Sequence, residues 1–118
     1  MDDGRPLFQQ IATRLEAQIL DGTMPAEAQV PSINELAEFH RINPATALKG
    51  VNILVDRGLL IKRRGIGMFV ASGAREKLLE QRRGEFQSMH LAPVALHAKA
   101  LGLTAIEVQR MLAKEMDR

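Results

Sequence analysis

The sequence predicts a mostly helical fold with one small β-hairpin. Apolar residues recur at three- and four-residue intervals over most of the 118 positions, helix-capping patterns recur along the chain, and one β-prone run with glycines lies near the middle. The chain is 46% apolar and 25% charged, which is typical of an ordinary globular protein. Its length suits one domain, or a small domain with a structured tail.

Composition excludes several function classes. The chain has no cysteine, which excludes disulfides, thiolate metal sites and cysteine nucleophiles. Aromatic residues make up 3%, too few for the stacking platforms of single-strand binders. Residues 1–6 include Asp2 and Asp3 rather than the basic start of a signal peptide, and no apolar run approaches the roughly 18 residues of a membrane span. We therefore expect a cytoplasmic protein without a membrane segment.

The carboxylates suggest helix caps and surface charge rather than catalysis. No Ser-His-Asp set has a supporting sequence context, so we predict that the chain is not an enzyme and needs no cofactor.

The first predicted helix begins at Pro6 and ends near Asp21 and Gly22. Proline is favoured at a first helical position, and glycine commonly follows a helix end. Residues 23–30 lack periodicity and predict a loop or short extended segment. The apolar stripe of the helix comprises Phe8, Ile11, Ala12, Leu15 and Ile19.

The second predicted helix starts at a capping box. The Ser32 hydroxyl can accept from a first-turn amide while the Glu35 carboxylate accepts from the Ser32 amide. The helix is short, because Asn43 and Pro44 signal another start about ten residues later. The residues expected to face inward are Ile33, Leu36, Ala37 and Phe39.

The third predicted helix starts at Asn43 and ends at Gly58. Two short helices separated by residues 40–42 have the spacing of a helix-turn-helix. The inward stripe of the third helix comprises Ala47, Gly50, Val51 and Leu54; small residues at Ala37, Ala47 and Gly50 permit a close helix crossing.

A hairpin follows the third helix. Residues 59–61 and 68–70 are β-prone, and Gly65 and Gly67 can supply positive φ in the turn between them. A hairpin placed after a helix-turn-helix predicts a wing. The glycines do not form a nucleotide-binding loop, because Val70 stands where a third glycine would be needed.

Charge is distributed unevenly along the chain. Residues 1–40 hold two basic and seven acidic residues, whereas residues 41–73 hold six basic residues and one acidic residue. Three of the basic residues, Lys62, Arg63 and Arg64, lead directly into the hairpin turn. This block predicts a surface that faces a polyanion.

Residues 74–118 predict a helical tail after a winged domain at 1–73. A break at Pro93 is expected to separate a first helix from a second that ends at Gly102, and a third begins at the Thr104 capping box. Because this break separates His90 from His97, we predict no metal site. The tail can pack on its own domain or pair with a second copy. The candidate dimerisation residues are Leu78, Leu79, Phe86, Met89, Leu96, Leu101, Ile106, Met111 and Leu112.

Several motifs in register resemble the DNA-binding domain of GntR-family bacterial transcription regulators. They are residues 31–37 (PSINELA), 42–46 (INPAT), 58–60 (GLL) and 64–70 (RGIGMFV), within a match over about residues 6–72. The Asn-Pro-x-Thr segment and short tail resemble the YtrA subfamily. This resemblance implies a small dimeric repressor, often encoded beside ABC-transporter genes, that binds a pseudo-palindromic operator.

The resemblance implies that the third helix enters the major groove and the wing meets the adjacent backbone or minor groove. Charge and position add Arg41, Lys62 and Arg63 as candidate DNA contacts. Asn34 and Leu48 depart from the arginine or glutamine common in relatives; Leu48 could instead contact a thymine methyl group. The contacts that the resemblance implies are Ser32, Asn43, Thr46, Lys49, Arg64, Gly65 and Gly67.

Three alternatives stay open. The winged helix could be an adaptor that binds protein through Leu48, Ile53 and Val55, although the basic wing favours DNA. A duplex-RNA binder fits less well, because a helix enters the deep, narrow RNA groove poorly. The tail is too short to enclose a pocket alone, but a dimer interface could hold a small-molecule effector.

Overall fold

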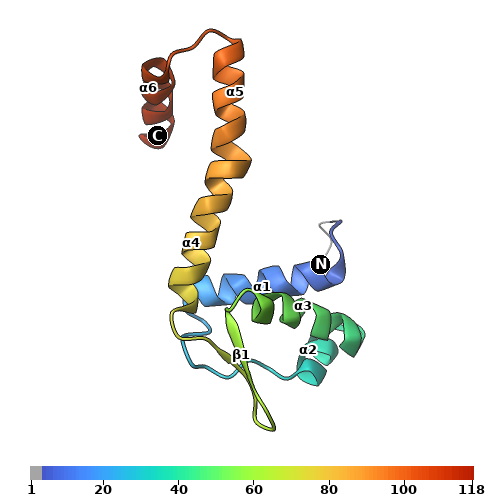
Figure 1. Cartoon of the computed structure of the whole chain (residues 1–118). Coiled ribbons are helices and arrows are strands. Elements are labelled where there is room, and N and C mark those ends of the chain that lie inside the picture. The colour runs from blue at the N-terminus through green and yellow to red at the C-terminus, as the bar shows by residue number, and fades with distance from the viewer. Residues whose placement is uncertain (1–3) are drawn as a thin grey trace. The chain divides into compact units, whose positions relative to one another are not determined.

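A computed structural model describes residues 4–118, so Asp2 and Asp3 lie outside the described range. The mostly helical prediction with one hairpin is confirmed (Figure 1). The chain forms two compact units, one extending to Glu80 and one spanning Gln81–Arg118. In chain order the elements are α1 (Leu7–Asp21), α2 (Ile33–His40), α3 (Pro44–Asp56), β1 (Leu60–Arg63), β2 (Gly67–Val70), α4 (Ala74–Phe86), a π-helical turn (Gln87–Leu91), α5 (Ala92–Ala100) and α6 (Ala105–Met116).

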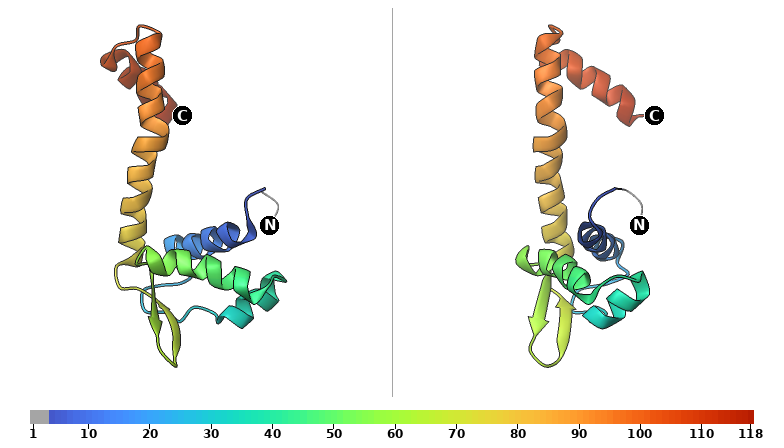
Figure 2. Two further views of the ribbon diagram at one scale, coloured as in Figure 1. Left: turned by 45° about the vertical axis from the view of Figure 1, so that its right-hand side comes forward. Right: turned by 90° about the vertical axis from the view of Figure 1, so that its right-hand side faces the viewer.

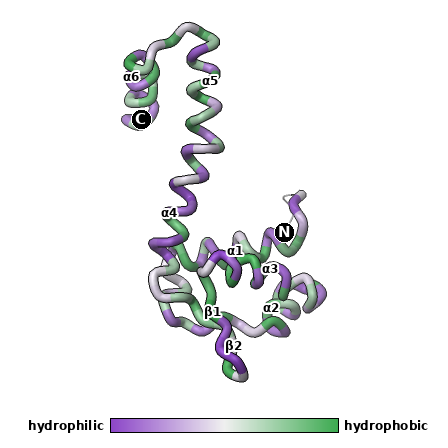
Figure 3. Tube along the Cα trace, viewed as in Figure 1, coloured by the Kyte–Doolittle hydropathy of each residue, from purple (hydrophilic) through white to green (hydrophobic). Residues whose placement is uncertain are grey.

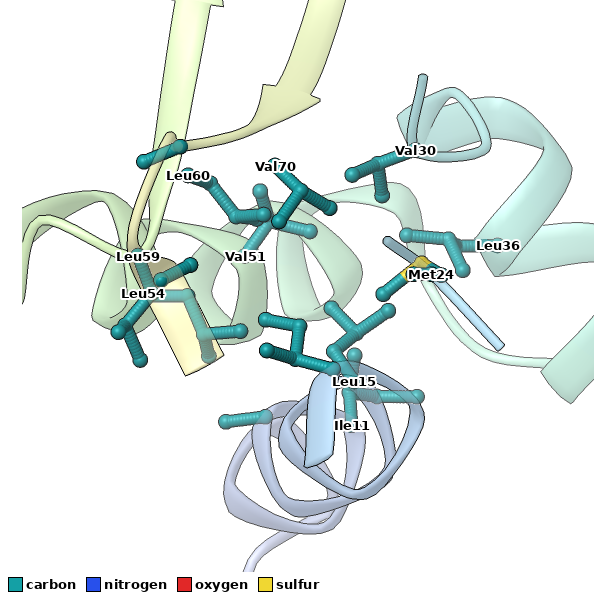
Figure 4. Packing of buried hydrophobic residues seen from close by; sticks show 14 of the residues in the cluster. Ile11, Leu15, Met24, Val30, Leu36, Val51, Leu54, Leu59, Leu60 and Val70 are labelled. Atoms are coloured by element: carbon teal, nitrogen blue, oxygen red, sulfur yellow. The ribbon is translucent and has the colours of Figure 1, made fainter. Parts of the chain in front are cut away.

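In the first unit, α3 packs against both α1 and α2, and the β1–β2 hairpin projects away from the helices (Figure 2). Apolar side chains from α1, α3 and the hairpin meet in one core (Figure 4). Ile11 and Leu15 of α1 approach Val51 and Leu54 of α3 there, and all four are at most 3% exposed. This shared core fixes the helix-turn-helix and the hairpin in position relative to each other.

The hairpin is antiparallel, with Leu60 opposite Val70 and Arg63 opposite Gly67. The preceding loop joins it along β2: the Val30 N–H donates to the Met68 carbonyl at 2.8 Å, and the Val70 N–H donates to the Ala28 carbonyl at 2.9 Å. The segment 23–30, predicted as a loop or short extended segment, therefore forms an isolated antiparallel bridge, Gln29 with Phe69, beside the two-stranded sheet.

Two local predictions in the first unit are wrong. Pro6 was expected at the first helical position, but its ψ of 145° is extended and Leu7 begins α1. Pro6 instead accepts hydrogen bonds at its carbonyl from the amides of Gln9 and Gln10. Phe39 was expected inward, yet it is 78% exposed, because the short helix α2 buries only Leu36 and Ala37.

Gly50 permits a close approach, but of a different helix pair from the one expected. A Cβ added there would lie 2.7 Å from the Phe8 carbonyl oxygen and 3.0 Å from the Ile11 Cβ. Both neighbours belong to α1, so Gly50 serves the α1–α3 contact rather than the α2–α3 crossing.

The predicted break at Pro93 is absent. A π-helical turn, Gln87–Leu91, joins α4 to α5, and the Ala92 N–H donates to the Gln87 carbonyl five residues earlier. Proline lacks an N–H and crowds the preceding turn of a regular helix, and the wider π turn accommodates it within a continuous helical path. His90 and His97 are therefore not separated by a break, contrary to the sequence prediction. In residues 4–118, no group of three or more metal-binding side chains of the His, Cys, Asp or Glu type is present.

The second unit contains little core of its own. Between Gln81 and Arg118, Ala98 is the buried residue, and no side chain of α6 is buried. The apolar residues predicted for dimerisation from Phe86 to Leu112 are all about half exposed or more. Leu78 must be removed from that set, because it is fully buried in the core of the first unit. Leu79 beside it is half-buried.

Nowhere in residues 4–118 does a helix combine the length and the apolar character that crossing a bilayer requires.

Candidate nucleic-acid interface

The predicted capping box at the start of α2 is present. The Ser32 Oγ accepts from the Glu35 N–H at 3.1 Å, and the Ser32 N–H donates to the Glu35 carboxylate at 3.0 Å. These hydrogen bonds, first the one from the backbone amide, hold the pKa of Glu35 below its usual value. Glu35 is therefore ionised at neutral pH and committed to the cap.

The turn between α2 and α3 is set by two backbone features. Arg41 has a left-handed φ of 54°, and its N–H donates to the Ala37 and Glu38 carbonyls, which ends α2. The Asn43 Oδ1 then accepts from the Ala45 N–H at 2.8 Å and begins α3 ahead of Pro44. The exposed Arg41 side chain thus stands beside the N-terminal end of α3.

His40 adds no charge to this turn at neutral pH. Desolvation, and then repulsion from the Arg14 guanidinium, lower the pKa of His40 below its usual value. Arg41 is therefore the basic group of the turn at pH 7.

An open groove of about 680 Å³ lies between α2, α3 and the hairpin. Its lining brings together five of the predicted DNA contacts, from the α2 cap and the wing: Ser32, Lys62, Arg63, Gly65 and Gly67. Leu48 of α3 also lines the groove and is 40% exposed. Arg41, Asn43, Thr46, Lys49 and Arg64 do not line this groove.

The hairpin turn presents two of the wing cations differently. The Arg63 guanidinium lies 4.7 Å from the centroid of the Phe69 ring. Lys62 is exposed and lines the same groove as Arg63. Arg64 is exposed in the turn, which closes when the Ile66 N–H donates to the Arg63 carbonyl at 3.0 Å and Gly65 takes a φ of 76°.

Figure 3 shows a hydrophilic stretch beside the turn of this hairpin and hydrophobic residues at its base. The cationic residues that lead into the turn therefore lie on an element that projects from the first unit.

Gln29 supports the wing, a role that the sequence did not predict. Its Nε2 donates to the Ile66 carbonyl at 3.3 Å, and a Cβ on Gly67 would lie 2.8 Å from that same nitrogen. Gly67, with a φ of 141°, thus leaves room for the Gln29 amide. No pattern in the loop sequence signals this contact, because it joins residues 37 positions apart.

Lys49 was predicted to reach guanine or phosphate. In the structure its Nζ lies 4.1 Å from the centroid of the Phe8 ring on α1. The side chain is exposed, but its head group already has a partner in the protein.

The structure weakens the case for a protein-binding adaptor, which rested on exposure of three apolar residues of α3. Leu48 is exposed as expected, but Ile53 and Val55 are only partly exposed and pack against the core.

Sequence comparison decides the family. Residues 7–70, more than half of the chain, match the family model described as bacterial regulatory proteins of the gntR family. This protein belongs to the GntR family. The matched range spans α1 through β2, which are the helix-turn-helix and wing described above.

Several curated GntR-type regulators are similar to this range. The chain is 33% identical over 73 residues to the HTH-type transcriptional regulator Rv0792c of Mycobacterium tuberculosis, covering 62% of this chain and 27% of that protein. It is 31% identical over 75 residues to the HTH-type transcriptional repressor YtrA of Bacillus subtilis, covering 64% of this chain and 58% of that protein. The matches thus span between about a quarter and three fifths of these relatives. Such relatives are transcriptional regulators, in agreement with the prediction that the chain is not an enzyme.

Solved structures are similar to this chain beyond the range that the family model matches. A GntR-family transcriptional regulator from Bacteroides thetaiotaomicron is 28% identical, with a TM-score of 0.81 over 95% of this chain and 97% of that chain. The DNA-binding domain of AraR, solved in complex with its operator ORR3, is 30% identical, with a TM-score of 0.55 over 56% of this chain and 80% of that chain. The predicted winged helix-turn-helix fold is therefore confirmed, and GntR-family domains of this kind bind operator DNA.

Proposed function

We propose that this GntR-family chain is a cytoplasmic, dimeric transcriptional repressor that binds a pseudo-palindromic DNA operator. The resemblance to the YtrA subfamily supports an operator near its own operon, with ABC-transporter genes among those regulated. The observation that carries the proposal is the groove in which the α2 cap, the exposed side of α3 and the cationic wing converge.

The candidate contacts, some of which line the groove, are assigned to two roles on duplex DNA. The Thr46 hydroxyl on α3 is assigned to a base edge in the major groove. The exposed Arg41 guanidinium and the wing cations Lys62, Arg63 and Arg64 are assigned to phosphates, and the Gly65 N–H to a phosphate oxygen. Ser32 and Asn43 cap α2 and α3. We assign the N-terminal ends of both helices to DNA phosphates.

The second unit supports dimerisation. A unit of 38 residues that buries only Ala98 leaves most of its apolar surface exposed to water. A groove of about 400 Å³ between α5 and α6 is lined by Leu91, Val94, Leu101, Met111 and Leu112 among others. We assign this face to a second copy of the chain, because a two-fold operator requires two winged domains.

Binding to DNA can be tested by fluorescence anisotropy on the duplex upstream of the gene and on a scrambled duplex of equal length, across a salt series. If each protomer neutralises three or four phosphates, log K should fall with log salt at a slope of about −5 to −7. A fourfold rise in salt then weakens binding by roughly three to four decades. Specific binding should exceed scrambled binding by at least about a thousandfold.

If the protein binds the two duplexes with equal affinity, binding sites are next selected from a random duplex library. If no palindrome is enriched, the repressor proposal is wrong and the protein-binding adaptor is favoured. The adaptor is then tested by capture of a protein partner that binds the natural chain and does not bind the Leu48→Ala variant.

The dimer has its own test. Sedimentation velocity should give a dimer for the natural chain and a monomer for Met111→Lys, whose charge enters the apolar face of α6. Asp117→Lys, at the end of the same helix, is the control and should remain dimeric. A natural chain that sediments as a monomer at micromolar concentration would overturn the dimer.

A further inference from the structure

We infer that the groove between α1 and α2 is a binding site for a small aromatic carboxylic acid, which regulates the protein through the neighbouring DNA-facing groove. The site itself is independent of the proposed DNA-binding function, whereas its regulatory effect rests on that function.

The groove between α1 and α2 has the size of a small-molecule site. Its volume is about 610 Å³, within the range of about 300–1,000 Å³ that is usual for such sites. Both of its walls belong to the first unit, where α1 and α2 each pack against α3. The groove is therefore bounded by helices that the core holds in place.

The floor of this groove is apolar, and an aromatic ring stands at its edge. Ile11 and Leu15 of α1 and Leu36 of α2 line the groove and are at most 6% exposed. Phe39 also lines it but is 78% exposed, and its ring meets the His40 imidazole edge to face with the centroids 4.9 Å apart. An aromatic ligand on this floor would cover the exposed Phe39 ring and gain the ring-to-ring contact that aromatic groups favour.

The charged groups of the lining favour an anion. Arg14 of α1 is the basic group at pH 7, because desolvation, and then repulsion from Arg14 itself, lower the pKa of His40. The acidic residue of the lining, Glu35, accepts from the Ser32 N–H and belongs to the α2 cap. Within residues 4–118, no carboxylate forms an ion pair with Arg14. A guanidinium holds a carboxylate through two parallel hydrogen bonds, so Arg14 complements a carboxylic acid.

Two residues connect this site to the DNA-facing groove. Pro31 and Glu35 line both grooves, which therefore meet at the start of α2. An acid bound beside these residues adds a negative charge near the surface proposed for phosphates. The acid and DNA should each weaken the binding of the other, because coupling between two sites is reciprocal.

Naphthoate is the probe, titrated at pH 7 into the isotope-labelled full chain and followed by NMR. The backbone amide signals of Arg14 and Phe39 should shift together and saturate with a Kd on the order of 0.1–1 mM. Naphthamide has the same rings without the charge, and it should bind about tenfold more weakly because it loses the charged hydrogen bonds.

Two variants assign the binding to this groove. Arg14→Gln should weaken naphthoate about tenfold and leave naphthamide unchanged, because only the acid uses the guanidinium charge. Phe39→Ala should weaken both ligands about fivefold, because it removes the ring contact that they share. The matched control is Arg110→Gln on α6, outside the lining, which should bind both ligands as the natural chain does. All three substituted side chains are exposed, so the variants should fold.

Regulation is measured by anisotropy on a duplex that the chain has selected from a random library. Saturating naphthoate should weaken binding to this duplex by at least about fivefold, and Arg14→Gln should lose the effect at the same naphthoate concentration. Acetate at that concentration controls for ionic strength, which by itself weakens binding to DNA.

The outcomes distinguish the site from its effect on DNA. The site is wrong if naphthoate does not saturate, if it binds no better than naphthamide, or if Arg14→Gln binds it as well as the natural chain does. Binding in the groove without a change in DNA affinity overturns the regulation and leaves the site. If the chain selects no DNA sequence, the proposed function fails and the regulation fails with it, while the NMR titration still decides the site.

Discussion

Lys49 of α3 lies over the ring of Phe8 of α1, with the Nζ 4.1 Å from the ring centroid. The contact joins the outward side of the proposed recognition helix to the first helix of the domain. A cation over an aromatic face is stabilised by the ring quadrupole, and at an exposed site the gain is about 0.5–1 kcal/mol.

We expect Phe8→Leu and Lys49→Met to be non-additive in stability. A double-mutant cycle measured by urea unfolding should give a coupling of about 0.5–1 kcal/mol between the two positions. Additive losses would mean that the ring does not hold the lysine.

Gly50→Ala should destabilise the first unit by about 1–3 kcal/mol, although alanine favours helix formation. The added Cβ would lie 2.7 Å from the Phe8 carbonyl oxygen, a backbone atom that cannot move aside without shifting α1. The control is Gly84→Ala in α4, where no heavy atom lies within 4 Å of the added Cβ; this change should be neutral or stabilise by up to about 1 kcal/mol. Thermal unfolding followed by circular dichroism measures both, and an unchanged melting temperature for Gly50→Ala would contradict the packing.

The Glu35 cap should make stability depend on acid pH. Because hydrogen bonds from Ser32 lower the pKa of Glu35 in the folded state, the cap stabilises fully above the ordinary value of 4.5 and is lost as the pH falls through the lowered folded-state pKa. The difference in urea midpoint between the natural chain and Glu35→Gln should therefore be largest at pH 7 and shrink below about pH 4. Glu38→Gln, an exposed change on the same helix outside the capping box, is the control and should show no such trend.

Arg64→Ala should weaken binding to all DNA sequences by a similar factor. Loss of one phosphate contact per protomer should flatten the log K against log salt slope by about 1.8 for a dimer. Thr46→Val should instead change the preferred bases and leave the slope unaltered. Arg110→Ala on α6 removes the same charge outside the winged domain. This control should change neither the base preference nor the slope of log K against log salt. A change in base preference with an unaltered slope for Arg64→Ala would reverse the assigned roles.

Local chemistry explains which features could be predicted from sequence. The Ser32 and Thr104 capping boxes and the Asn43 cap form between residues two or three positions apart, so their side-chain chemistry appears directly in the sequence. The hairpin turn is similarly local, because Gly65 and Gly67 supply the positive φ angles it needs. These signals placed the helix starts and the wing.

The sequence by itself therefore determined the order of the helices, the helix-turn-helix spacing, the cationic wing and the family. Tertiary structure decided which side each residue faces, because that depends on contacts between segments distant in the chain. Helix α1 meets Gly50 and Lys49, Phe39 remains in solvent, and Leu78 enters the first core instead of the tail surface. Only the packed unit brings Leu48 of α3 together with the wing cations, since no local signal links a helix to a hairpin tip fifteen residues later.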